Sequence, residues 1–328
     1  MKNGQIGNFF DKDFTLYRFM ARFLLSLPLM KRISMLLMAL LASATLSAQE
    51  LKIPAQETAM PVIDAQSLGM GGVTMASAQD AHALFNNAAM TAFTLHPMRI
   101  SASYYGQTEF DYYGLSGYWR FDRNNTLQIG WRQYLREKGN RDSALDLGYT
   151  RRLGEEFSVA AVARYMHLKR YTEEQDALAL DLAAGWKHPI EGWKHYSTVR
   201  LGAKLSNLGT MLGDSELSLP MEMKVGAALE TFFSDQHQLT VGCDLGYYFT
   251  PAAVRGFQAA LGAEYNLMQL IQLRAGYHIG ERDAYYPSFG SVGAGIRILH
   301  IRVDFAYLIA KKSSLLHNTY SISFGLDF

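Results

Sequence analysis

Apolar and polar residues alternate with a period of two from Met98 to the C-terminal Phe328. In the segment 237–248, for example, Val241 and Leu245 alternate with Asp244. This period places successive side chains on opposite faces of a β-strand. Turn residues interrupt the alternation and divide it into fourteen candidate strands: 98–105, 111–121, 126–135, 143–153, 157–171, 177–189, 195–206, 221–231, 237–248, 257–265, 271–278, 288–298, 301–308 and 319–328.

The composition indicates which kind of β-protein this is. Hydrophobic residues make up 49% of the chain and aromatic residues 12%, yet outside the N-terminal region no apolar run approaches the roughly 18 residues of a transmembrane helix. Alternating strands explain both observations, because polar and apolar residues cancel in any hydropathy window. The apolar faces often end in Tyr, Trp or Phe, as in an interfacial aromatic girdle. We therefore predict an all-β fold, a transmembrane antiparallel β-barrel of about fourteen strands.

The segments between the candidate strands differ in length in a regular way. Those after odd-numbered strands, such as 207–220 and 279–287, are longer than those after even-numbered strands, such as 122–125 and 154–156. Bacterial barrels have long outer loops and short periplasmic turns. The sheet must close, since an open edge in lipid would leave unpaired backbone groups. We expect a bacterial outer-membrane location, with Phe328 as a terminal aromatic signal for the barrel-assembly machinery.

The N-terminal region has the features of a secretory signal peptide. Lys31 and Arg32 precede an apolar segment, 33–41, and small residues precede a cleavage point before Gln49. We assign residues 1–48 to this signal-peptide region and take Met30 as the true start. These residues hold an excess of basic side chains, so the remaining chain is slightly acidic and has no basic stripe for nucleic acid.

Residues 49–97 do not alternate and precede the barrel, which spans 98–328. They contain a Gly-rich stretch, 66–73, and a candidate short helix within 77–90. A barrel of fourteen strands is too wide for wall side chains alone to fill. We therefore expect this segment to form a plug, or hatch, and we single out six of its residues: Gly69, Gly71, Gly72, Asp80, Asn86 and Asn87.

Chemical motifs are weak along the whole chain. The single cysteine, Cys243, excludes a disulfide framework and a Cys-rich metal site. The Gly69-Met70-Gly71-Gly72 sequence lacks the spacing of a phosphate-binding loop. The nine His residues have no metal-ligand spacing. We predict no catalytic residues, no metal, no cofactor and no enzymatic activity.

The polar faces of the strands carry charges of both signs. Two interpretations are open: a structural network that holds the hatch, or a lined pathway or binding cavity. Substitution of a lipid-facing residue by Lys or Arg should harm assembly, whereas lumen substitutions should mainly tune function. The candidate lumen charges are Asp146, Arg200, Lys204, Glu222, Lys224, Asp244, Glu264, Arg274, Arg297, Arg302 and Asp304.

Several short motifs follow one another in a definite order: 64–73 (DAQSLGMGGV), 80–89 (DAHALFNNAA), 205–209 (LSNLG), 219–220 (LP), 224–227 (KVGA), 262–265 (GAEY), 273–277 (LRAGY), 293–296 (GAGI) and 303–307 (VDFAY). In this order they resemble the PorV/PorQ family of Bacteroidetes, within the wider FadL-like barrels. The similarity covers nearly all of residues 60–328. One departure is that the family often has Asn-Pro-Ala in its hatch, where this chain has Asn87-Ala88-Ala89. We expect a less rigid turn there.

The resemblance implies a fourteen-stranded barrel with an N-terminal hatch and a role in type IX secretion. PorV-like members receive cargo with a C-terminal signal domain and pass it to the attachment complex. The outer loops would then be the docking surface, because exposed apolar groups suggest a protein or lipid contact. Packing of these loops on one another is the alternative. The contact candidates are Met211, Leu212, Leu217, Phe249, Tyr285 and Tyr286.

Three functions are compatible with the sequence. The main hypothesis is a PorV/PorQ-type barrel that assists type IX secretion by binding exported cargo. The alternatives are a FadL-like channel for hydrophobic small molecules and a structural barrel of unknown role. A channel would need an apolar pocket beside the hatch, whereas the predicted inner face is charged. The expected partners are outer-membrane lipid, type IX secretion components with their cargo, and the barrel-assembly machinery during biogenesis.

Overall fold

The computed structural model describes residues 64–77, 80–107, 110–136, 140–170, 173–190, 195–213, 218–280, 287–312, 314 and 316–328. These residues all belong to one compact unit, Gln49–Phe328. The predicted signal-peptide region, with Met30 and the cleavage point before Gln49, lies outside the described residues, as do residues 49–63 of the predicted hatch. No helix among the described segments has the length and apolar character to cross a membrane.

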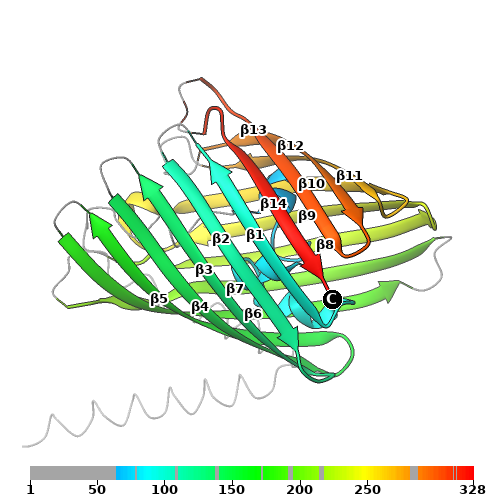
Figure 1. Cartoon of the computed structure of the whole chain (residues 1–328), viewed down its shortest axis with the longest axis horizontal. Coiled ribbons are helices and arrows are strands. Elements are labelled where there is room, and N and C mark those ends of the chain that lie inside the picture. The colour runs from blue at the N-terminus through cyan, green and yellow to red at the C-terminus, as the bar shows by residue number, and fades with distance from the viewer. Residues whose placement is uncertain are drawn as a thin grey trace, which may run out of the picture. The chain divides into compact units, whose positions relative to one another are not determined.

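Fourteen antiparallel strands close into a barrel in which each strand pairs with its neighbours in sequence and β1 pairs with β14 (Figure 1). The predicted fold class and strand number are therefore confirmed. The strands are β1 Met98–Gly106, β2 Phe110–Arg120, β3 Asn125–Arg136, β4 Asn140–Leu153, β5 Phe157–Arg170, β6 Glu173–Ile190, β7 Tyr196–Leu212, β8 Glu222–Ser234, β9 His237–Tyr248, β10 Gly256–Leu267, β11 Ile271–Ile279, β12 Phe289–Ile298, β13 Ile301–Ile309 and β14 Tyr320–Asp327.

The two faces of each strand differ in exposure, as the alternation predicts. On β9, Leu245 is 49% exposed on the outer face, whereas its neighbour Asp244 is buried on the inner face. On β13, Val303 and Phe305 are likewise exposed on either side of buried Asp304. The wall thus presents apolar side chains outward, where lipid can solvate them, and buries polar side chains within the lumen.

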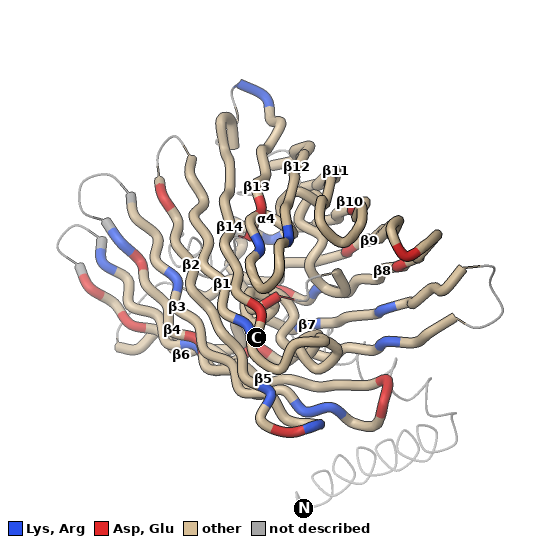
Figure 2. The backbone as a smooth tube through the Cα atoms, turned by 45° about the vertical axis from the view of Figure 1, so that its right-hand side comes forward, with Lys and Arg blue, Asp and Glu red and all other residues tan. Residues whose placement is uncertain are grey.

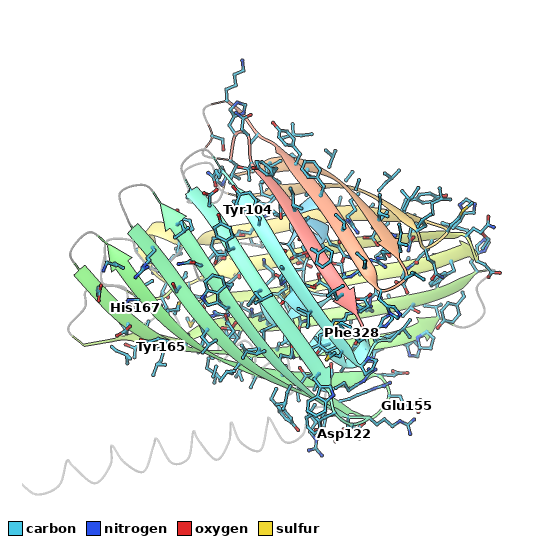
Figure 3. All side chains as sticks on the ribbon, viewed as in Figure 1. Tyr104, Asp122, Glu155, Tyr165, His167 and Phe328 are labelled. Carbon is cyan, nitrogen blue, oxygen red and sulfur yellow. The ribbon has the colours of Figure 1, made fainter. Side chains whose placement is uncertain are left out.

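The two ends of the barrel carry different connections. Short turns join β2 to β3, β4 to β5 and β12 to β13, and we call this the short-turn end. Figure 3 shows Asp122, Glu155 and the exposed Phe328 at this end, and Tyr104 and Tyr165 toward the other, outer-loop end. The longer connections lie at the outer-loop end, after β7, β9, β11 and β13. Charged residues lie both near the ends of β3 to β6 and within these strands (Figure 2).

The largest difference from the predicted strand boundaries lies at the end of β7. The segment from Asn207 to Leu212, expected to be part of an outer loop, continues β7 as a strand. The pairing of β6 with β7 shifts register between Leu180 and Leu182. Asn207, at the shift, has a φ of 59°, the left-handed region that Asn tolerates better than most residues. A bulge of this kind changes the phase of the alternation without ending the strand.

The described residues ahead of β1 fold inside the ring of strands (Figure 1). They form α4 Ala65–Gly69 and the 3-10 helices η1 Ala81–Leu84 and η2 Ala88–Phe93; another 3-10 helix, η4 Ala252–Val254, lies between β9 and β10. Helix α4 contacts β11 to β14, whereas η2 contacts β3 to β6. Nearly every described residue from Asp64 to Thr94 is buried. We call residues 64–97 the hatch, because they occupy the lumen.

Candidate functional site

The hatch begins with a capped helix. Asp64 is the N-cap of α4, and its Oδ1 accepts a hydrogen bond from the Ser67 backbone N–H at 2.7 Å. Its Oδ2 accepts a second bond, at 2.9 Å, from Nδ2 of Asn86, one of the predicted hatch residues. The same carboxylate therefore fixes the start of α4 and ties it to the chain after η1.

A tight turn follows α4 at the predicted Gly-rich stretch. Gly71 and Gly72 have φ angles of 73° and 83°, which L side chains rarely adopt. A Cβ on Gly71 would lie 2.5 Å from the backbone N of Tyr277 on β11. The Gly71 N–H donates to Ser291 Oγ at 2.9 Å, and Ser291 Oγ donates to the Gly69 carbonyl at 3.1 Å. These glycines let the hatch backbone lie directly against the wall.

Asp244 on β9 is the strongest wall contact of the hatch. Its Oδ2 accepts hydrogen bonds from the backbone N–H groups of Thr74, at 2.6 Å, and Met75, at 3.1 Å. The Thr74 hydroxyl donates to the same oxygen at 2.9 Å. Burial of a carboxylate is unfavourable unless hydrogen bonds or charges compensate it. Asp244, predicted as a lumen charge, is thus an anchor for the hatch.

The second half of the hatch is fixed by Asp80, His82 and Asn87. Asp80 caps η1, where its Oδ1 accepts from the His82 backbone N–H at 2.9 Å. The His82 ring nitrogens lie 2.6 Å from the hydroxyls of Ser103 on β1 and Ser116 on β2. Asn87 caps η2 and donates to the carbonyls of Met75 and Ala184 at 2.8 and 3.1 Å. The two wall contacts of His82 were not predicted from the sequence.

A network of buried ion pairs fills the lumen beside the hatch. Arg164 on β5 lies between two carboxylates, 2.6 Å from Asp146 and 2.8 Å from Asp181. Arg132 on β3 lies 3.1 Å from Asp146. Lys204 on β7 lies 2.9 Å from Asp181 and donates to the hatch carbonyl of Phe85 at 2.7 Å. Each of these three cations has a carboxylate partner, which is what a buried charge requires.

Two smaller networks lie near α4 and β1. Arg274 bridges Glu264, at 2.6 Å, and Asp304, at 2.7 Å. Arg302 lies 3.4 Å from Asp327 and 3.7 Å from Asp80 of the hatch. Arg302 therefore joins Asp80 of the hatch to Asp327 on β14, the strand at which the barrel closes.

The eleven predicted lumen charges all lie on the inner face. Nine are buried, and Lys224 and Arg297 are half-buried; Lys224 lies 3.5 Å from Glu222 on the same strand. The prediction omitted Arg132, Arg164 and Asp181. The alternation could have found Arg132, since Gln128 and Gly130 share its face and Trp131 lies on the other. Alternation also places Asp181 on the inner face, since Leu180 and Leu182 on either side of it are exposed, but its ion partners Arg164 and Lys204 follow only from the tertiary structure.

The lumen toward the outer-loop end is apolar. Side chains from β1, β2, β3, β12 and β13 pack there with the loop residue Leu316. A second buried group joins Met166, Leu168 and Met211 with Leu219. We call the first group the outer aromatic cluster; its members at this end are Tyr105, Phe110, Tyr112, Tyr134, Phe289, Ala306, Leu308 and Leu316.

The predicted outer-loop contacts are only partly where they were expected. The prediction that Met211 is a loop contact is wrong, because this residue lies within β7 and is buried against Met166 and Leu219. Leu212 is exposed, but on a strand rather than a loop. Phe249 is buried as well. Leu217, Tyr285 and Tyr286 lie outside the described residues.

Among the residues that the structure describes, no cluster of His, Cys, Asp or Glu could hold a metal.

Comparisons with known proteins give the fold but no closer identity. No family model matches the chain, and no curated protein matches it. Among solved structures it is similar to the CymD monoaromatic hydrocarbon channel, with a TM-score of 0.52 and 15% identity, covering 81% of this chain and 97% of that one. It is also similar to a TodX monoaromatic hydrocarbon channel deltaS2 mutant, with a TM-score of 0.55 and 11% identity, covering 83% of this chain and 100% of that one.

A third similar structure is the Pseudomonas putida toluene transporter TodX, with a TM-score of 0.53 and 10% identity, covering 83% of this chain and 99% of that one. These neighbours are transport channels, not enzymes. They support the barrel fold and give no support to the narrower PorV/PorQ assignment. The chain has the fold of an outer-membrane β-barrel with a hatch in its lumen.

Proposed function

We propose that this protein is an outer-membrane channel for hydrophobic small molecules. The observation that carries the proposal is the outer aromatic cluster, an apolar region of the lumen on the outer-loop side of a barrel closed by a hatch. Apolar surface favours transfer of a hydrophobic solute out of water. The barrel likeness to hydrocarbon channels adds support, since it spans nearly their whole length.

The proposal includes an orientation and a route of export. The short-turn end faces the periplasm and the outer-loop end faces outward, as in bacterial barrels. Residues 1–48, with Met30 as the start, direct export, and Phe328 is read by the barrel-assembly machinery. A hydrophobic solute would enter at the outer aromatic cluster, and the hatch would have to rearrange before the solute could pass.

The test is solute uptake by a host that lacks its own hydrocarbon channel. Cells that carry the protein should take up radiolabelled toluene several-fold faster than cells with the empty vector. A charged solute of similar size, benzoate, is the specificity control and should show no gain. Equal toluene uptake with and without the protein, at equal outer-membrane levels of folded barrel, would contradict the proposal.

The secretion role implied by the PorV/PorQ resemblance is the second candidate. One observation favours it: the hatch and the buried ion pairs fill the middle of the lumen, so the outer surface is free to act without a conducting pore. Its partners would be type IX secretion components and cargo with a C-terminal signal domain. Deletion of the gene followed by an inventory of surface proteins tests it; normal display of such cargo would rule the role out.

A further inference from the structure

The hatch leaves a polar cavity of about 490 Å³ at the short-turn end of the barrel. The cavity lies between hatch residues such as Gln66 and the inner wall, and it reaches the highly exposed Leu95 and Leu299. This volume is within the range of small-molecule sites. Its lining is mostly polar, in contrast to the outer aromatic cluster, so the proposed passage of hydrophobic solutes does not account for it.

The cavity has an excess of positive charge. Five basic side chains line it, against three carboxylates. An excess of one sign within a concave, low-dielectric site attracts ligands of the other sign. The basic residues are Arg99, Lys187, Arg200, Arg297 and Arg302, and the carboxylates are Glu230, Glu264 and Asp327.

Two pairs of these cations stand directly opposite each other in the sheet. Lys187 on β6 is the register partner of Arg200 on β7. Arg297 on β12 is the register partner of Arg302 on β13. Like charges at directly opposed positions destabilise a sheet. Folding alone therefore gives no reason to place either pair at this cavity.

In each pair, one cation has a carboxylate partner and the other has none. Arg200 lies 3.2 Å from Glu230, and Arg302 lies 3.4 Å from Asp327. Neither the Lys187 ammonium nor the Arg297 guanidinium makes a hydrogen bond or an ion pair with any residue that the structure describes, and Arg297 Nε is buried in that state.

A third opposed pair provides the contrast. Lys204 and Lys224 are register partners on β7 and β8. Lys204 lies 2.9 Å from Asp181, and Lys224 lies 3.5 Å from Glu222. Here the fold supplies a carboxylate for each cation, and neither residue lines the cavity. The uncompensated cations are thus found at the cavity, where a ligand could neutralise them.

The geometry points to a binding site for a polar organic anion that carries at least two acidic groups. Lys187 and Arg297 come from β6 and β12, on opposite sides of the closed barrel, so each would hold one acidic group of the ligand. Thr198, Gln238 and Asn266 line the same cavity and offer hydrogen bonds to a hydroxylated spacer. Carboxylates and phosphates both fit this chemistry, and the ligand would arrive from the periplasm in the proposed orientation.

The test is calorimetric titration of the full barrel in detergent with citrate and with fructose 1,6-bisphosphate. Acetate and inorganic phosphate are the single-anion controls. We expect citrate to bind at least ten-fold more tightly than acetate, or fructose 1,6-bisphosphate to bind at least ten-fold more tightly than inorganic phosphate. The first result would indicate a site for carboxylates, and the second a site for phosphates. Lys187→Met and Arg297→Met should each weaken binding by ten-fold or more. Arg123→Met, at an exposed position in the β2–β3 turn at the same end and outside the cavity lining, should leave binding unchanged.

Thermal unfolding without ligand separates a ligand-binding cation from a structural one. Both Met variants should keep or raise the Tm, because each removes one of two opposed like charges. The proposal is overturned if neither polyanion binds, if the single anions bind as tightly, if the double variant binds like the parent, or if both variants lose Tm. Toluene uptake by the double variant, Lys187→Met with Arg297→Met, is a separate measurement. Failure of the anion site can therefore be distinguished from failure of the channel.

Discussion

Asp244 Oδ2 accepts hydrogen bonds from both the backbone N–H and the hydroxyl of Thr74, at 2.6 and 2.9 Å, and so joins β9 to the hatch. This relationship predicts that Asp244→Ala frees the hatch without opening the sheet. Two backbone donors would be left unpaired, at a cost of about 1–3 kcal/mol each. Limited proteolysis should cut the hatch faster in this variant, while the folded barrel still resists heat in gel-shift assays.

The control for Asp244→Ala is its neighbour on the outer face, Cys243→Ala. Cys243 is exposed, so this change should leave hatch proteolysis as in the parent. Equal protection of the hatch in Asp244→Ala and Cys243→Ala would show that the carboxylate does not anchor it.

A charge introduced on the lipid face should lower the folding yield far more than the loss of a charge in the lumen. Leu245→Arg places a cation on the outer wall, where a bilayer makes it unfavourable by up to about 2–4 kcal/mol. Arg200→Ala, on the inner face, should preserve assembly, since it removes the ion pair with Glu230 and places no charge in the lipid. Folding yield in liposomes measures both. A Leu245→Arg yield equal to that of the parent would contradict the face assignment.

Gly202 on β7 is where the hatch backbone comes closest to that strand. A Cβ at this position would overlap the carbonyl oxygen of Met75. Gly202→Ala should therefore push the hatch aside at a cost of about 1–3 kcal/mol, and planar-bilayer recordings should show increased ion conductance. In Gly290→Ala the added Cβ would meet nothing nearer than 3.8 Å. If both variants conduct equally, the absence of a side chain at Gly202 is not what allows the hatch backbone to pack against β7.

Ala88 occupies the position at which the family that this sequence resembles often has Pro. It is the first residue of η2, directly after the cap Asn87, whose φ of −132° is extended. Pro suits the first helical position, because that N–H needs no helical partner. Ala88→Pro should thus stabilise the hatch by about 0.4–1 kcal/mol, seen as slower hydrogen exchange of η2. Faster exchange of η2 would mean that the turn cannot accept Pro.

The strands could be predicted closely because alternation is a local property of the sequence. Leu245 and Asp244 reveal their faces by position alone. The bulge at Asn207 could not be predicted in this way, because it shifts the phase of the alternation. The residues after it, up to Leu212, were therefore predicted to be a loop. Met211 was consequently expected at the surface.

The candidate site was less predictable because it depends on pairing across the lumen. Gly71 and Asn87 were identified as hatch residues from composition, but their wall partners lie far along the chain. The face of Asp181 follows from alternation with Leu180 and Leu182, but its role becomes evident only beside Arg164 and Lys204. The opposed cations Lys187 and Arg200 depend on strand register, which alternation does not determine.

The central claim is that a hydrophobic solute passes only when the hatch moves. In a Cys243→Ser background, Val73→Cys with Gly242→Cys should form a disulfide between hatch and β9, because a Cβ on Gly242 would lie 2.8 Å from Val73 Cγ1. Cells with the oxidised pair should take up toluene at the empty-vector rate, and reduction with dithiothreitol should restore uptake. Each single Cys variant should be insensitive to oxidation. Undiminished toluene uptake through a fully oxidised hatch would contradict the account.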